Sequence, residues 1–380
     1  MKKVIFLILI SLTISCKNDN SNDQVLMTSS AENYALLNIV DTVNIPLGMK
    51  EYYASLQNQI VKRGDSTYLY RENGLNKTVD VYNWNSKVKE ESLSFQGVER
   101  FGGSPVLPLA GDSILIGTLG GEIIVAFRDS LLHSTEPGKE LQQVRFYAKN
   151  PYKPVKIENE VFMYVPPNSR QSDPEFQNRP LIASYNLETT ETRTLNIHYP
   201  GYFTQNCWSE HQFPLSFTKN SKNQLVFSFQ TGSPLYVYDV AKDSVIEEKN
   251  TAESNYVSEI IPYEDCDFQD VTKYFKYLKS TARYRSIIYD EYRNVYYRLV
   301  SLPTEQSSDG QRNHDILAPL SIMVLDENLN KIMEKRLPNK TYDPNDFFVT
   351  ERGLWISTNN EGSDSFNENT LSYALFQFDT

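Results

Sequence analysis

Cys16 is the residue whose type and position most clearly indicate chemistry in this chain. It follows an N-terminal segment with a basic start at Lys2 and Lys3, the apolar run VIFLILI, and a stretch of mostly small residues that ends at Ser15. This order is typical of a cleaved signal peptide. The apolar run is far shorter than the roughly 18 residues that a membrane-spanning helix needs. We therefore expect residues 1–15 to be removed and Cys16 to become the first residue of the mature chain.

A cysteine at that position offers a thiol for lipid attachment. The segment before it resembles a lipobox, although Thr13 stands where leucine is usual. In a lipobox the thiol takes a diacylglyceryl thioether, and acyl chains hold the protein by burying methylene groups at about 0.8 kcal/mol each. The polar stretch KNDNSNDQ then predicts a flexible tether over residues 16–34. We expect a lipoprotein held at the outer membrane, on its periplasmic or cell-surface side, with ordinary secretion and an incidental cysteine as the alternative.

Two further cysteines, Cys207 and Cys266, remain after the anchor. In an exported protein such a pair is compatible with one disulfide bond. Two buried free thiols are the alternative, because nothing in the sequence itself pairs these residues.

Signatures of catalysis and of metal binding were sought across the whole sequence. It contains no GxSxG motif, no glycine-rich phosphate loop, no CxxC motif and no aspartate ladder of the EF-hand kind. The histidines lack the close spacing of zinc ligands; they are His133, His198, His211 and His314. No catalytic residue, metal ligand or cofactor is therefore assigned.

The charge balance excludes one class of partner. Removal of Lys2 and Lys3 leaves 35 basic against 48 acidic side chains, a net charge of −13 for the mature chain. Because proteins that bind nucleic acid need a basic surface, nucleic acid is not an expected partner.

A four-strand unit, with strands A to D, recurs along the chain. Short runs rich in valine, isoleucine, tyrosine and phenylalanine alternate with Gly, Asn, Asp and Pro clusters, which is the pattern of an all-β protein. In the clearest copy, A is residues 213–217, B is 224–229, C is 234–240 and D is 244–249. The B strands of six units start at Ser66, Ser113, Val161, Leu225, Val295 and Leu354, and the C strands start at Val79, Glu122, Leu181, Leu235, Leu320 and Leu371.

Six such units predict a six-bladed β-propeller, in which the blades surround a central channel. Seven blades, or a pair of sheet domains, are the alternatives. The chain ends after strand C of the sixth unit, and the strand-like segment 35–47 precedes the first unit. We expect this segment to supply the missing outer strand and close the ring, so that one propeller domain spans residues 35–380.

Several of these strand motifs resemble a known family. The segments HQFPLSF, NQLVFSF, PLYVYDV and IIYDEYRNVYYRLV, the last at 287–300, are similar to those of Bacteroidota lipoproteins catalogued as domain of unknown function 4221. The resemblance implies a six-bladed propeller of similar length that is exported and lipid-anchored. It implies no reaction, because the family has none assigned.

The long connections of the predicted propeller gather on one face. Strands A and C run one way and B and D the other, so B-to-C loops and D-to-A connections emerge together. Long B-to-C loops occur at 166–180, 303–319 and 359–369, and a long D-to-A connection occurs at 198–212. A second one, from 263 to 284, contains a predicted helix with an apolar stripe of Phe268, Val271, Phe275 and Leu278 and with Asp267 or Asp270 as its N-cap.

Because insertions on a rigid scaffold often carry function, we expect a binding face over units three to six. The candidate contacts are Tyr202, Trp208, His211, Arg283 and Arg285. The alternative is that the aromatic side chains only pack against the tops of the blades.

A second recurrent pattern places Asp before Ser or Thr and then an aliphatic residue or threonine. It resembles an O-glycosylation acceptor of exported Bacteroidota proteins, and the acceptors would be Thr42, Ser66, Ser113, Ser130 and Ser244. Asp also favours turns before strands, which explains the pattern equally well.

The sequence is compatible with two functions. The first is a non-catalytic propeller that binds an unidentified protein, peptide or glycan. The second is a propeller hydrolase or lactonase with its site at the channel mouth. Carboxylates that converge at the channel mouth would favour the enzyme.

Overall fold

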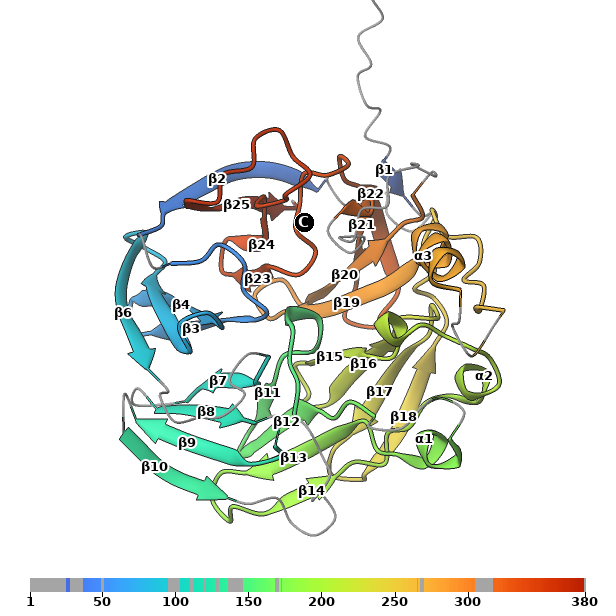
Figure 1. Ribbon diagram of the computed structural model, residues 1–380, viewed down its shortest axis with the longest axis horizontal. Coiled ribbons are helices and arrows are strands. Elements are labelled where there is room, and N and C mark those ends of the chain that lie inside the picture. The colour runs from blue at the N-terminus through green and yellow to red at the C-terminus, as the bar shows by residue number, and fades with distance from the viewer. Residues whose placement is uncertain are drawn as a thin grey trace, which may run out of the picture.

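The computed structural model describes residues 25–27, 37–48, 51–94, 103–109, 113–118, 120–127, 130–135, 146–167, 171, 173–264, 266, 270–304 and 317–378. They form six antiparallel sheets around a central axis (Figure 1). The predicted six-bladed β-propeller is therefore confirmed. Cys16 lies outside the described residues, as do most of the predicted tether and most of the 303–319 loop.

Each blade has its A strand nearest the axis and its D strand at the rim. Blade one is β3 (Asn58–Arg63), β4 (Ser66–Asn73), β5 (Thr78–Asn83) and β6 (Val88–Ser94). Blade two is β7 (Val106–Pro108), β8 (Ser113–Gly117), β9 (Ile123–Phe127) and β10 (Ser130–Thr135). Blade three is β11 (Val155–Ile157), β12 (Glu160–Tyr164), β13 (Ile182–Asn186) and β14 (Thr192–Thr194).

Blade four is β15 (Leu215–Lys219), β16 (Leu225–Phe229), β17 (Leu235–Asp239) and β18 (Ser244–Lys249). Blade five is β19 (Arg283–Asp290), β20 (Val295–Ser301), β21 (Leu320–Leu325) and β22 (Lys331–Arg336). Blade six is β23 (Phe347–Thr350), β24 (Gly353–Ser357), β25 (Thr370–Gln377) and β2 (Asn38–Pro46). Every B and C strand begins within one residue of its predicted start.

Burial within a blade explains why its strands differ in composition. All five residues of β16, LVFSF, are buried, because neighbouring blades cover both faces of a B strand. The rim strand β18, SVIEEK, is mostly exposed and carries charged residues. The A strand of the same blade starts two residues later than predicted, at Leu215, after the 3-10 helix η4 (Glu210–Gln212). Pro214 lacks the N–H that a strand ladder needs.

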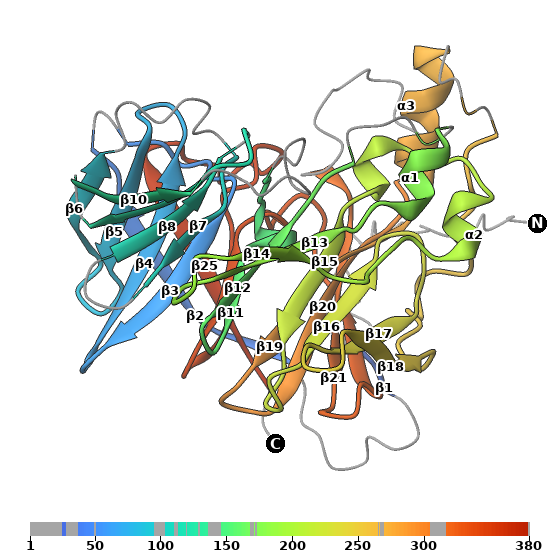
Figure 2. The same cartoon turned by 90° about the horizontal axis from the view of Figure 1, so that it is seen from below.

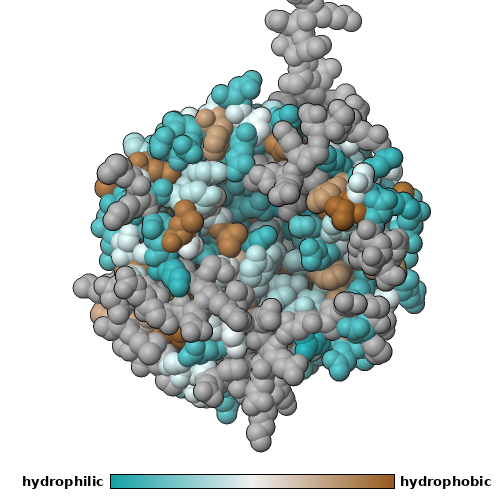
Figure 3. Space-filling view, viewed as in Figure 1, coloured by the Kyte–Doolittle hydropathy of each residue, from teal (hydrophilic) through white to brown (hydrophobic). Residues whose placement is uncertain are grey.

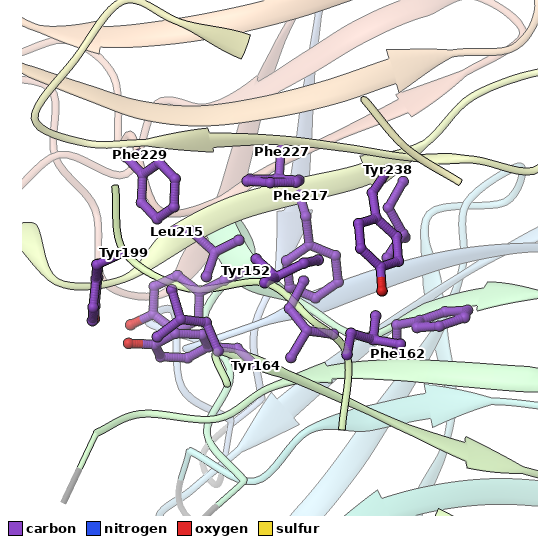
Figure 4. Close-up of a cluster of buried hydrophobic side chains, with 14 of the residues drawn as sticks. Tyr152, Phe162, Tyr164, Tyr199, Leu215, Phe217, Phe227, Phe229 and Tyr238 are labelled. Atoms are coloured by element: carbon purple, nitrogen blue, oxygen red, sulfur yellow. The ribbon is translucent and has the colours of Figure 1, made fainter. Parts of the chain in front are cut away.

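The largest apolar cluster lies between blades three and four (Figure 4). Phe162 and Tyr164 from β12 face Phe217 of β15 and Phe227 of β16 across the gap between the two sheets. Aromatic side chains bury a large area each, and they are the main packing contacts between these blades. The core is therefore built between blades rather than within one sheet.

The ring is closed by the segment before the first blade, as expected. Strand β2 pairs antiparallel with β25, and Ile45 lies opposite Leu371. One further pairing was not expected. Strand β1 (Val25–Met27) pairs with β22 and adds a fifth strand to blade five. Three residues of the predicted 16–34 tether thus belong to a sheet.

Three α-helices lie on the same side of the ring (Figure 2). They are α1 (Pro174–Asn178), α2 (Gly201–Thr204) and α3 (Val271–Ser280). Each belongs to a long B-to-C loop or D-to-A connection, so these connections share one face, as predicted. We call this side the loop-rich face. None of the helices in the described part of the chain is long and apolar enough to cross a membrane.

Helix α3 differs from its prediction in one respect. Asp270 is its N-cap, and the Asp270 carboxylate accepts a hydrogen bond from the Lys273 amide at 3.0 Å. Of the expected apolar stripe, Leu278 is buried, but Val271 and Phe275 are 61% and 38% exposed. The predicted helix is present, but only Leu278 of these three stripe residues is buried. Phe268 and Asp267 lie outside the described residues.

Candidate functional site

The described structure gathers buried and half-buried polar side chains at the loop-rich end of the channel. They lie at or just before the starts of A strands, or at the ends of the strands beside them. We call this group the central polar cluster, and its members are Asn58, Arg71, Asn150, Lys153, Arg285, Asp343, Asn345, Asp346 and Tyr373. On the face seen in Figure 3, hydrophilic and intermediate colours dominate around the centre of the ring.

Asp346 is the hub of the central polar cluster. The Arg71 guanidinium forms an ion pair with the Asp346 carboxylate at 3.0 Å, and both side chains are almost fully buried. The Tyr373 hydroxyl donates a hydrogen bond to the same carboxylate at 2.9 Å, and the Asn58 amide donates another. A buried carboxylate needs such partners, because burial of an unpaired charge is costly. These contacts join blade one to blade six.

A chain of asparagines continues around the axis. The Asn150 side-chain oxygen accepts from the Asn58 backbone amide at 2.7 Å, and the Asn150 side-chain amide donates to the Asn345 carbonyl. Arg285 donates from its guanidinium to the Asn345 side-chain oxygen. Because Asn150 precedes blade three and Arg285 begins blade five, the cluster ties four blades together at the channel mouth.

Lys153 and Asp343 differ from the rest of the cluster, because no described residue forms an ion pair with either. Lys153 is half-buried, and its ammonium has a contact of 3.5 Å with the Asn58 carbonyl. Burial lowers the pKa of Lys153 to about 8, although the nearby Asp346 acts in the opposite direction. Burial, together with the negative charge of Asp346, raises the pKa of Asp343 to about 6. Shifted pKa values of this kind concentrate at functional sites.

The arrangement offers two chemical capabilities. Arg71 and Asp346 neutralise each other, Arg285 is buried beside Asp343 and lowers its pKa, and Lys153 is a half-buried cation at the mouth. Near neutral pH, a ligand would meet cations that attract an anionic group and a carboxylate that accepts hydrogen bonds. No group of three or more potential metal ligands occurs among the residues that the structure describes.

The residues predicted from sequence as contacts do not form one surface. Trp208 is only 2% exposed and donates from its indole nitrogen to the Phe203 carbonyl at 3.0 Å. The Tyr202 ring lies against Gly232 and packs on the apolar cluster of blades three and four. Burial makes Trp208 an unsuitable contact, whereas Tyr202 is half-buried and its part in binding stays a prediction. They fit the alternative, which was packing against the blade tops.

The other three predicted contacts are separated from one another. His211 is exposed on η4, and its backbone amide donates to the Ser209 hydroxyl. Arg283 and Arg285 are 3% and 4% exposed at the start of β19. Only Arg285 joins the central polar cluster.

Sequence reasoning missed most of the central polar cluster. Its members are polar residues that immediately precede or begin an A strand, such as Asn58 and Asp346. At single positions such residues look like ordinary turn formers. Their positions differ from unit to unit, so the repeat itself gave no signal for them.

Cys207 and Cys266 form a disulfide, with their Cα atoms 5.1 Å apart. Next to it, the Tyr263 amide donates to the Cys207 carbonyl at 2.8 Å. The bond links the connection before blade four to the connection before blade five.

The glycosylation pattern falls mainly on strand starts. Four of the acceptors are the first residues of β4, β8, β10 and β18. Thr42 is exposed within β2, at the rim of blade six. The turn interpretation accounts for the four strand starts, and modification of any acceptor stays a prediction.

Residues 128–336, more than half of the chain, match the family described as "Domain of unknown function (DUF4221)". No curated protein matches the chain. A crystal structure of a DUF4221 family member from Bacteroides vulgatus is similar, with 21% sequence identity and a TM-score of 0.76. That similarity covers 92% of this chain and 99% of the other.

A second similar crystal structure is that of a putative exported protein from Bacteroides fragilis. It has 9% sequence identity and a TM-score of 0.53, and the similarity covers 93% of this chain and 97% of the other. At these identities the likeness to both structures concerns the fold.

Proposed function

The chain belongs to the DUF4221 family, and from that premise we propose that it is an exported, lipid-anchored and non-catalytic propeller that binds a ligand at its channel mouth. The ligand is one that carries an anionic group, such as the carboxylate of a peptide or of an acidic glycan. The observation that carries this proposal is Lys153, a half-buried cation with no described ion-pair partner.

The anchor is supported by the sequence around Cys16. The basic start, the short apolar run and the following cysteine fit lipid attachment at that thiol. A similar structure is described as a putative exported protein, which agrees with export of this chain. Intact mass of the protein from membranes tests the anchor, because a diacylglyceryl group on Cys16 adds mass that a Cys16→Ser variant lacks.

Lys153 supports binding because a purely structural role explains it poorly. An enclosed ammonium costs free energy unless it has a carboxylate or several acceptors around it. Its one described hydrogen bond is the long one to the Asn58 carbonyl, and the charge of Asp346 acts on it without forming an ion pair. An anionic group of a ligand would supply the missing partner, with Arg285 close to the same channel mouth.

A matched pair of lysine variants tests the binding site. Lys153→Met removes the enclosed cation, whereas Lys156→Met removes an exposed one from the same segment. Thermal shift against a panel of small carboxylates, inorganic phosphate and acidic oligosaccharides should show stabilisation of the wild type and of Lys156→Met. Equal responses from Lys153→Met and the wild type would refute the proposed site.

One observation favours the enzymatic alternative. The pKa of Asp343, raised to about 6, is suited to a carboxyl group that gains and releases a proton near neutral pH. A hydrolase would lose turnover of a bound ester or lactone in Asp343→Asn while it still bound the substrate. A pure binding protein would show no turnover in either form.

A further inference from the structure

Helix α3 presents an unusual surface for an acidic protein. Val271 is 61% exposed, Phe275 is 38% exposed, and Ile261 in the preceding connection is 63% exposed. The helix also carries three lysines and no acidic residue, in a chain whose net charge is −11. Lys276, directly after Phe275, is also exposed. Exposed apolar residues flanked by lysines are typical of helices that lie at a membrane surface.

The C-terminal half of the helix is held in place. Leu278 is buried, and the Tyr277 hydroxyl donates to the Gln212 side chain of η4 at 3.0 Å. The disulfide ties Cys266, which precedes the helix in the chain, to Cys207. Figure 2 shows α3 standing above the neighbouring strands on the loop-rich face. Its exposed side is therefore a supported surface rather than the face of a free loop.

The N-terminal segment that follows the proposed lipid site joins the propeller at blade five, and α3 lies in the connection that leads into this blade. Strand β1 runs antiparallel to β22, and Val25 lies opposite Lys335, near the end of β22 that leads to the loop-rich face. The chain between Cys16 and Val25 can span at most about 30 Å. A lipid on Cys16 would therefore lie within about 30 Å of Val25 at the rim of blade five.

We propose that α3 rests on the membrane surface that holds the lipid of Cys16. This inference depends on the anchor proposed above. Val271 and Phe275 enter the interfacial layer, and Lys276 and Lys279 lie toward anionic headgroups. Two apolar side chains bind a bilayer weakly by themselves. The lipid anchor holds α3 close to the bilayer, so the effective concentration of the helix at the membrane is high and a weak contact suffices.

The native tryptophans make a sensitive probe feasible. The three tryptophans of the chain, Trp84, Trp208 and Trp355, are at most 5% exposed. A Phe275→Trp variant therefore adds one exposed indole at the proposed contact. Val88→Trp is the matched control, because Val88 is 56% exposed at the rim of blade one, across the ring from α3 (Figure 1).

The full-length lipidated chain is reconstituted into vesicles of phosphatidylcholine and phosphatidylglycerol at a ratio of about 7 to 3. With brominated phosphatidylcholine, we expect roughly a twofold loss of the added fluorescence for Phe275→Trp and none for Val88→Trp. Equal quenching of the two variants would overturn the proposal. If Phe275→Trp does not fold, Val271→Trp replaces it at the neighbouring exposed position.

Flotation separates this inference from the anchor on which it rests. Wild-type protein that fails to float with vesicles, like a Cys16→Ser control, shows that the anchor is wrong. Protein that floats while Phe275→Trp stays unquenched shows that the anchor is right and that α3 does not contact the bilayer. Quenching that decreases when phosphatidylglycerol is omitted supports the part assigned to the lysines.

Discussion

Lys153→Met tests whether the enclosed lysine is kept for binding rather than for stability. Burial lowers the pKa of Lys153 from 10.5 to about 8, so the folded protein disfavours its charged form. Each pKa unit corresponds to about 1.4 kcal/mol, and the full shift to about 3 kcal/mol. Because the side chain is only half-buried, water screens part of this cost. We expect Lys153→Met to raise the free energy of unfolding at pH 7 by about 1–3 kcal/mol.

The pH dependence of this gain has a definite sign. Between about pH 8 and pH 10.5, the unfolded chain still binds a proton at Lys153 that the folded chain has released. The stability of the wild type therefore rises with pH across this window. The methionine variant has no such proton. The difference between the two proteins is thus largest below about pH 8 and shrinks as the pH approaches 10.5.

Urea unfolding of both proteins, followed by tryptophan fluorescence at about pH 7 and about pH 10, measures this difference. Lys156→Met is the control, because it makes the same chemical change at an exposed position of β11 and should alter stability by less than about 0.5 kcal/mol. A loss of stability in Lys153→Met, or a gain that is the same at both pH values, would refute the reasoning. A gain in stability accompanied by loss of ligand response is the expected signature of a residue kept for function.

Four further predictions concern stability and modification. Burial raises the pKa of the Glu72 carboxyl to about 7, so in urea unfolding Glu72→Gln should be more stable than the wild type at about pH 8 and equal to it near pH 4.5. Asp346→Ala leaves the buried guanidinium of Arg71 without its carboxylate, and urea unfolding should show a loss of about 3–5 kcal/mol. Reduction of the Cys207–Cys266 bond, which closes a long loop, should lower the free energy of unfolding by up to about 4 kcal/mol when measured with and without reductant. Intact mass of protein from its native host should exceed that of the lipidated chain by glycan masses, and a mass equal to the lipidated chain alone would exclude glycosylation at the five acceptors.

The strands were predictable because their signal is local. Each B strand is a short run of β-branched and aromatic residues between turn formers, and six repeats fix the number of blades. Closure of the ring was predictable because the sixth unit lacks a fourth strand and the strand-like segment 35–47 belongs to no unit. The pairing of β1 was not predictable, because it depends on the exposed edge of β22 rather than on any pattern in Val25–Met27.

The central polar cluster was hidden for a different reason. Asn58, Asn150 and Asp346 are far apart in sequence, and each resembles a turn residue in its own unit. Only the ring brings them into contact. Helix α3 shows a similar limit, since an apolar stripe indicates which side of a helix is apolar but not whether a neighbour covers it. Val271 and Phe275 lie on that stripe and are nevertheless exposed.

The position of Asp346 connects stability to the proposed binding. Blade one packs against blade six, in which β2 pairs with β25 and closes the ring, and residues 47–57 join the two blades along the chain. We call the contact between these two blades the seam. Trp84 of blade one packs edge-on against Phe348 and Trp355 of blade six. The Arg71–Asp346 ion pair crosses the same seam at the loop-rich end. Lys153 and Asp343 lie near this ion pair, since the charge of Asp346 affects the pKa of both residues. An anionic ligand that pairs with Lys153 would add a favourable charge interaction next to the seam. Its binding should therefore raise the free energy of unfolding of the closed ring.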